Sequence, residues 1–93
     1  MSAQDLVLNI AVNLGRLSKW AMEGKSDRIK QFILDTQNYL DQLENTPKSL
    51  KFKPTYTSFK RKFEELKKSE PNKVWAEDAL TWANILTHRA KLA

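Results

Sequence analysis

The only histidine of the chain, His88, is its first candidate for chemistry, because an imidazole titrates near neutral pH and serves as acid, base or metal ligand. On a helix near the end of the chain, four polar residues would share one stripe at spacings of four, three and four: Glu77, Thr81, Asn84 and His88. A carboxylate and an imidazole could then line one groove. The same stripe is also typical of the solvated face of an amphipathic helix.

Other catalytic and cofactor chemistries lack the residues they need. The chain has no cysteine, which excludes disulfides, thiolate metal sites and cysteine nucleophiles. One histidine with scattered carboxylates does not give the paired ligand spacing of a metal site. Gly15 and Gly24 stand alone, so no glycine-rich turn can cradle a phosphate. The sequence therefore predicts a non-enzymatic protein without a metal or cofactor.

Basic residues gather in one part of the chain. The whole sequence carries 16 Lys and Arg against 11 Asp and Glu, a net charge of +5. Residues 48–73 hold nine of the basic residues and three of the acidic ones, so the whole excess lies there. Such an asymmetry is typical of a surface that binds a polyanion. The candidate polyanion-binding residues are Lys51, Lys53, Lys60, Arg61, Lys67 and Lys68.

Aromatic residues are interleaved with this basic segment. Phe59, Phe63 and Leu66 recur at helical spacing, which favours a place in the core. Lys60 and Lys67, seven residues apart, should then lie together opposite the aromatic stripe. The lysines either contact phosphates, with an exposed aromatic stacked on an unpaired base, or simply keep a helix face solvated.

Two further features of the segment leave its role open. Phe52 is flanked by Lys51 and Lys53 in an expected loop. It either plugs the end of the fold or stays available to a partner. Glu64 and Lys68 stand four residues apart in the favourable order for a helical ion pair, and this pair would dilute the positive field.

The first two elements that must position these residues are helices with clear signals at their ends. A helix over residues 3–23 is predicted, because Ser2 and Asp5 have the spacing of a capping box. Gly24 ends it in a left-handed conformation. Ser26 is the expected N-cap of the second helix, whose apolar residues follow one stripe.

Prolines delimit the second half of the chain. We expect a loop over residues 45–54, bracketed by Pro47 and Pro54, because proline lacks an amide hydrogen and restricts the residue before it. A third helix near 55–69 and a fourth that starts near Asn72 and runs to the end of the chain complete the pattern.

Four amphipathic helices with mostly short connections predict an all-α four-helix bundle, most simply up-down-up-down. No segment alternates with the period of a strand. A chain of 93 residues has enough apolar surface for one core and not for two, so residues 1–93 are expected to form a single domain.

A second apolar surface is expected on the first helix. Its core face includes Leu14, which places Leu8 and Val12 on the far side beside Gly15. Either this helix is central and touches two neighbours, or these residues meet a partner or a second copy. Trp20 stands at the edge between the two faces. The candidate partner contacts are Leu8, Val12, Trp20 and Phe52.

The apolar stretch near the N-terminus does not resemble a secretory signal, because Asp5 precedes it and Asn9 interrupts it. No window contains the ~18 continuous apolar residues that would span a bilayer. We expect a soluble, cytoplasmic protein with no membrane partner.

Two functional hypotheses remain. The first is a small adaptor or assembly subunit that binds a protein partner or itself, with the basic segment meeting an acidic surface. The alternative is a nucleic-acid-binding protein, for example within a ribonucleoprotein, whose basic residues follow the phosphates. No small-molecule substrate is inferred.

Overall fold

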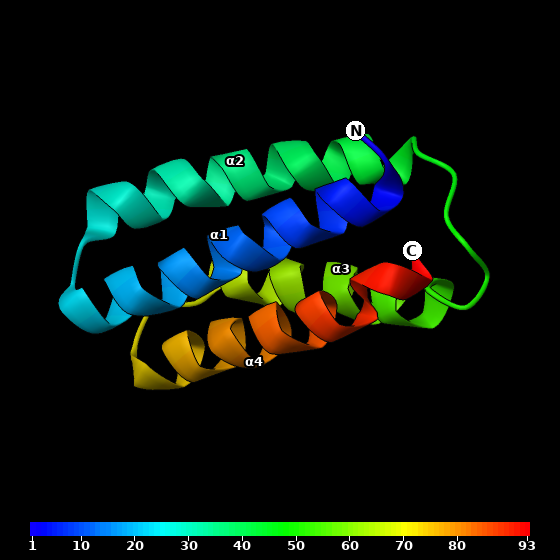
Figure 1. Cartoon of the computed structure of the whole chain (residues 1–93). Coiled ribbons are helices and arrows are strands. Elements are labelled where there is room, and N and C mark those ends of the chain that lie inside the picture. Colours follow the sequence, from blue (N-terminus) through cyan, green and yellow to red (C-terminus); the bar gives the residue numbers. More distant parts are fainter.

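The computed structural model describes residues 1–93 as four α-helices and a terminal 3-10 turn (Figure 1). The elements are α1 (Ala3–Glu23), α2 (Ser26–Glu44), α3 (Lys53–Lys68), α4 (Lys73–Arg89) and η1 (Ala90–Leu92). Successive helices run in opposite directions (Figure 1). The predicted all-α four-helix bundle is confirmed, and its long axis measures 37 Å against 19 Å for each of the other two.

The ends of α1 are built as its sequence predicts, whereas the start of α2 is not. The Ser2 hydroxyl accepts a hydrogen bond from the Asp5 backbone N–H, and the Asp5 carboxylate accepts one from Ser2. Gly24 ends the helix with φ of 70°, a conformation that favours glycine. Ser26 was expected to be the N-cap of α2, but it is the first helical residue, and Lys25 precedes it without a side-chain cap.

The loop between α2 and α3 is shorter than its prolines indicate. Helix α3 begins at Lys53, two residues earlier than expected, and it includes Pro54 in its first turn. A proline is tolerated there because its missing N–H would have no helical acceptor in any case. Lys48 fills the other end of the loop, where its ammonium donates to the carbonyl oxygens of Leu43 and Thr46 and so closes α2.

Helix α4 begins after Asn72, as expected, but ends before the chain does. The Asn72 side-chain oxygen accepts a 3.0 Å hydrogen bond from the Trp75 backbone N–H. After Arg89 the chain tightens into η1. The carbonyl of Ala93 then accepts a hydrogen bond from the backbone N–H of Ser49, so the α2–α3 loop is tied to the C-terminus.

Helix α1 lies between α2 and α4 (Figure 1). Its approach to α4 is close because the facing stripe of α4 is made of small side chains, which let two backbones come near each other. This stripe is buried and consists of Ala76, Ala79 and Ala83. The buried Ser18 hydroxyl donates a 2.7 Å hydrogen bond to the carbonyl oxygen of Ala76, which fixes the register of the two helices.

Helix α3 lies between α2 and α4 on the side of the bundle opposite α1. Lys67 of α3 donates to Gln37 of α2, and Lys62 of α3 contacts Asp78 of α4. The predicted core position of its aromatics is confirmed, because Phe59 and Phe63 are both buried. The α1 and α3 helices therefore occupy diagonal corners, and their outward sides face away from each other.

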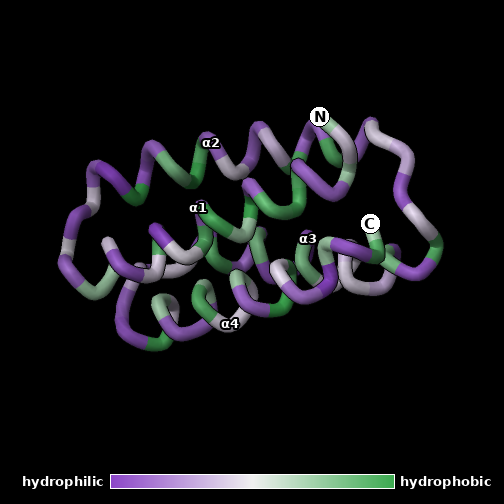
Figure 2. The backbone as a smooth tube through the Cα atoms, in the orientation of Figure 1, coloured by the Kyte–Doolittle hydropathy of each residue, from purple (hydrophilic) through white to green (hydrophobic).

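Hydrophobic residues recur along every helix and alternate with hydrophilic ones (Figure 2). The apolar sides meet in one continuous core cluster of 20 buried residues drawn from all four helices. None of the helices combines the length and the apolar character that crossing a membrane requires.

Candidate functional site

The polar stripe of α4 lies on the solvent side of the helix. All four of its members are exposed: Glu77, Thr81, Asn84 and His88. No hydrogen bond or ion pair joins any two of them, and no pocket is lined by them. Nowhere in the molecule do three His, Asp or Glu side chains gather closely enough to hold a metal ion. The stripe presents four separate solvated side chains.

The expectation that Lys60 and Lys67 lie opposite the aromatic stripe is wrong. The Lys60 ammonium lies 4.5 Å from the centre of the Tyr56 ring, and the Lys67 ammonium lies 5.3 Å from the centre of the Phe63 ring. Each lysine follows its aromatic by four residues, so on a helix it stands on the neighbouring turn and its stem covers the ring. Both lysines therefore line the α2 edge of α3.

Both of these lysines also have acidic partners within the chain. The Lys60 ammonium lies 3.5 Å from a carboxylate oxygen of Glu44. The Lys67 ammonium lies 2.6 Å from Glu64 and lowers the pKa of that carboxyl through a hydrogen bond. The expected partner of Glu64 was Lys68, which forms no ion pair. These contacts partly neutralise the charges of Lys60 and Lys67 within the chain.

Glu44 is the centre of the α2–α3 contact. The Tyr56 hydroxyl donates a hydrogen bond to its carboxylate, which lowers the pKa of Glu44, and Lys60 lowers it further. Burial, together with the same hydrogen bond, raises the pKa of Tyr56. On the α4 side, the Lys62 ammonium lies 3.5 Å from Asp78 of α4, and a hydrogen bond to Glu65 of α3 itself raises the pKa of Lys62. These polar contacts hold α3 on both flanks.

Five cations of this region are exposed and form no ion pair. Lys73 is at the start of α4, and the other four, which we call the basic face, are Lys51, Lys53, Arg61 and Lys68. Arg61 and Lys68 are seven residues apart, two helical turns, and so share the outward side of α3. Four of the six sequence-predicted polyanion-binding residues therefore form no ion pair within the chain, whereas Lys60 and Lys67 do.

Two of the four partner-contact candidates are integrated into the fold. Phe52 is only 1% exposed, so it plugs the end of the bundle and is not available to a partner. The loop that carries it is folded inward, and Phe52 stacks on Tyr56. Trp20 is half-buried, because its ring meets Phe32 edge-on at 4.6 Å and the Arg28 guanidinium covers it at 5.5 Å.

The other two candidates are exposed on the outer side of α1. Leu8 is 38% exposed and Val12 is 52% exposed. Together with Gly15 and the exposed Lys19 they form what we call the outer face of α1. This outcome fits the arrangement of the fold, because α1 contacts α2 and α4 with its flanks and turns its remaining side to solvent.

Leu80 of α4 is a further exposed apolar side chain and was missed in the sequence. It is 49% exposed. Because α1 and α4 are antiparallel and Ser18 bonds to Ala76, Leu80, which follows Ala76 by four residues, stands at about the level of Leu14 on α1. The sequence signal for its exposure was that Leu80 follows Ala76 by four residues and so lies at the edge of the buried alanine stripe of α4, not within it.

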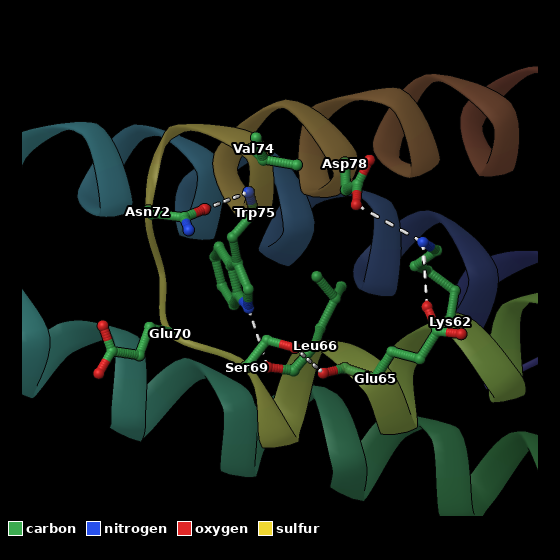
Figure 3. A pocket seen from close by; sticks show the side chains of 9 residues that line it. All are labelled: Lys62, Glu65, Leu66, Ser69, Glu70, Asn72, Val74, Trp75 and Asp78. Atoms are coloured by element: carbon green, nitrogen blue, oxygen red, sulfur yellow. Dashed lines mark hydrogen bonds and ion pairs between the residues drawn. The ribbon is translucent and has the colours of Figure 1, made fainter.

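Two pockets flank the junction of α3 and α4. One has a volume of about 230 Å³, and Figure 3 shows its lining, with the Trp75 ring between Leu66 and Asn72 and with Lys62 held between Glu65 and Asp78. Lys62 pairs with Glu65 and Asp78, and Asn72 accepts a hydrogen bond from the Trp75 backbone N–H, whereas the Glu70 side chain has no such partner. The second, of about 470 Å³, lies between α2 and this junction and is lined by apolar residues that include Ile29, Ile33 and Leu34.

Comparison with protein-family models, with curated proteins and with solved structures finds no match for this chain.

Proposed function

We propose that the protein is a non-enzymatic adaptor that acts by binding, through two different surfaces on opposite sides of its bundle. The observation that carries this proposal is the exposure of Leu8 and Val12 on the outer face of α1. Exposed apolar side chains that gather on one side of a small protein are typical of a surface that a protein partner covers.

The basic face supplies the second surface. Its four cations lack carboxylate partners within the chain, although neighbouring lysines have them. Unpaired cations on one side attract an anionic partner and speed its encounter. In our proposal this partner is an acidic protein segment, and the side chains that contact it are Lys51, Lys53, Arg61 and Lys68.

The second candidate function is nucleic-acid binding, which the two-turn spacing of Arg61 and Lys68 along one side of α3 favours, because phosphate contacts need cations in a row. No aromatic side chain of the basic segment supports it, since all four are buried and cannot stack on a base: Phe52, Tyr56, Phe59 and Phe63. We therefore prefer the acidic protein partner.

The experiment that separates the two measures binding of poly-L-glutamate and of a DNA oligonucleotide of equal charge, at about 50 and 150 mM salt. The adaptor proposal expects tighter binding of polyglutamate, and the double substitution of Arg61→Gln with Lys68→Gln should weaken it. Lys30→Gln with Lys91→Gln is the matched control, because it removes the same charge from exposed lysines that form no ion pair.

Tighter binding of the oligonucleotide would favour the alternative. There the slope of log affinity against log salt should fall by about one for each phosphate-contacting cation removed. Absence of binding to both polymers at about 50 mM salt would contradict a role for the basic face.

A further inference from the structure

Gly15 is a residue that the isolated bundle does not require. It lies in the middle of α1, where glycine costs about 1 kcal/mol relative to alanine. A Cβ atom built at this position meets no other atom within 4 Å, so neither helix packing nor a close backbone approach within the chain explains it. A glycine with open space around it on an exposed apolar face is suited to the close approach of a second helix from outside.

The outer side of α1 also has the spacing of a helix-pairing seam. Six residues follow one another at alternating intervals of three and four: Asp5, Leu8, Val12, Gly15, Lys19 and Met22. All of them except Gly15, which is half-buried, are exposed. This heptad spacing keeps one stripe of a helix facing a partner helix along its length. The buried residues of α1 lie on its other side.

We propose that this seam pairs with the same seam of a second copy of the chain, with the two α1 helices antiparallel about a two-fold axis. This inference rests on the proposed function and names the partner of the outer face of α1. The charges of the seam select both the partner and the direction. One end carries Asp5 and the other carries Lys19, so only an antiparallel pairing brings opposite charges together.

The antiparallel register also fits the sizes of the side chains. With the two-fold axis between Val12 and Gly15, each Val12 packs over the partner's Gly15, where no Cβ stands in its way. Each Leu8 packs against the stem of the partner's Lys19, whose ammonium reaches toward Asp5 of the first chain one turn away. A parallel pairing would instead place Asp5 against Asp5, where like charges repel, and Gly15 against Gly15, where no side chain fills the space between the helices.

An interface formed mainly by one helix of each chain lies at the small end, below about 1,200 Å² in total, so we expect a weak dimer. Sedimentation velocity of the full chain from ~10 μM to ~1 mM should show a concentration-dependent shift from monomer to dimer. Lys19→Glu, which turns the charge pairs into repulsive ones, should raise the dimer dissociation constant at least ~10-fold, equivalent to about 1.4 kcal/mol. Lys30→Glu on α2 makes the same charge change outside the seam and should leave the dissociation constant unchanged.

Gly15→Ala separates a role in pairing from a role in folding, because the two should change in opposite directions. The substitution should raise the urea midpoint of the monomer, measured at low concentration, since alanine favours the helix. It should also raise the dimer dissociation constant, because the new methyl group occupies the space of the partner's Val12. A Gly15→Ala chain that is stabilised and dimerises as well as the parent would overturn the proposal.

The remaining outcomes separate this inference from the function on which it rests. A chain that stays monomeric up to ~1 mM but binds polyglutamate through the basic face overturns the dimer and leaves the adaptor. A chain that stays monomeric and binds no acidic polymer overturns both.

Discussion

The indole N–H of Trp75, at the start of α4, donates a 2.8 Å hydrogen bond to the carbonyl oxygen of Leu66, in the last turn of α3. A carbonyl in the last turn of a helix has no helical donor of its own. The side chain of the next helix supplies one here, inside the core, since Trp75 and Leu66 are both buried. The bond fixes the turn between the two helices from within (Figure 3).

Replacing Trp75 should therefore lower the free energy of unfolding by more than the loss of side-chain volume alone would, because the hydrogen bond to Leu66 is lost as well. Trp75→Phe keeps an aromatic ring but leaves the Leu66 carbonyl with only a weak contact from Ser69, 3.4 Å away. We expect unfolding to become easier by about 1–3 kcal/mol in urea titrations. Trp82→Phe is the matched control, since Trp82 is half-buried and its indole N–H bonds to no other residue, and it should cost less.

The close contact of α1 and α4 should not tolerate a large side chain. Ala76 is buried against α1, where its carbonyl accepts the Ser18 hydroxyl. Ala76→Leu should destabilise the fold by about 1–3 kcal/mol through overpacking. The midpoint temperature of thermal unfolding should fall by about 4–8 °C for each kcal/mol of destabilisation in a domain of this size. Thr81→Leu on the exposed side of the same helix should shift the midpoint far less, and equal effects would contradict the packing that we describe.

The acid stability of the protein should depend on the contact between Tyr56 and Glu44. The pKa of Glu44 is lowered from 4.5, so this carboxylate contributes stability that is present above pH 4.5 and is lost as the pH falls through its lowered value. Tyr56→Phe removes the largest cause of the lowering. The free energy of unfolding, measured in urea between pH 7 and 2.5, should fall less steeply in this variant than in the parent chain.

Glu44→Gln is the corresponding control, because it removes the titrating group itself. In this variant too, the free energy of unfolding should fall less steeply as the pH is lowered. Glu64, whose pKa is also lowered, contributes to the acid limb in all three proteins. An unchanged acid limb in both variants would mean that the contact does not stabilise the fold.

Two adjacent lysines should differ in their effect on stability. Lys67 covers Phe63 and bonds to Glu64 and Gln37, whereas Lys68 makes none of these contacts. Lys67→Ala should cost about 0.5–1.5 kcal/mol, from lost packing of its stem and a lost ion pair. Lys68→Ala should stay within about 0.5 kcal/mol. Both substitutions lie in the last turn of α3, so the helix dipole affects them alike. Similar losses in the free energy of unfolding, measured by urea titration, would contradict this difference between Lys67 and Lys68.

The fold was largely predictable because helical periodicity reports which side of each helix is apolar. The four helices and the core position of Phe59 and Phe63 follow from a spacing of three and four residues, whereas the exposure of Leu8 and Val12 was left open between two alternatives. The start of α3 was misplaced because Pro54 was taken as a boundary. A proline excludes the interior of a helix but not its first turn.

The candidate site was predictable only in part, because its features depend on contacts between distant residues. The sequence assigned Lys60 to a free basic row, but a lysine one turn beyond an aromatic can cover the ring and reach across to Glu44 of another helix. The position of Phe52 depends on the loop around it, which the bond from Ser49 to Ala93 ties to the chain end. The four-residue spacing from Tyr56 to Lys60 is a local pattern, but no local pattern encodes the contact with Glu44 or the closure of the loop.

The diagonal placement of α1 and α3 sets the reach that a bivalent partner would need. In a dimer joined through α1, the two basic faces lie at the far ends of the assembly, separated by two bundle widths of 19 Å each. An extended polypeptide advances at most about 3.6 Å per residue, so a linker of roughly a dozen residues is the shortest that could connect acidic segments on both faces. Partners with a shorter linker would bind one basic face at a time, and only partners with a linker above this length would gain affinity by binding both faces at once.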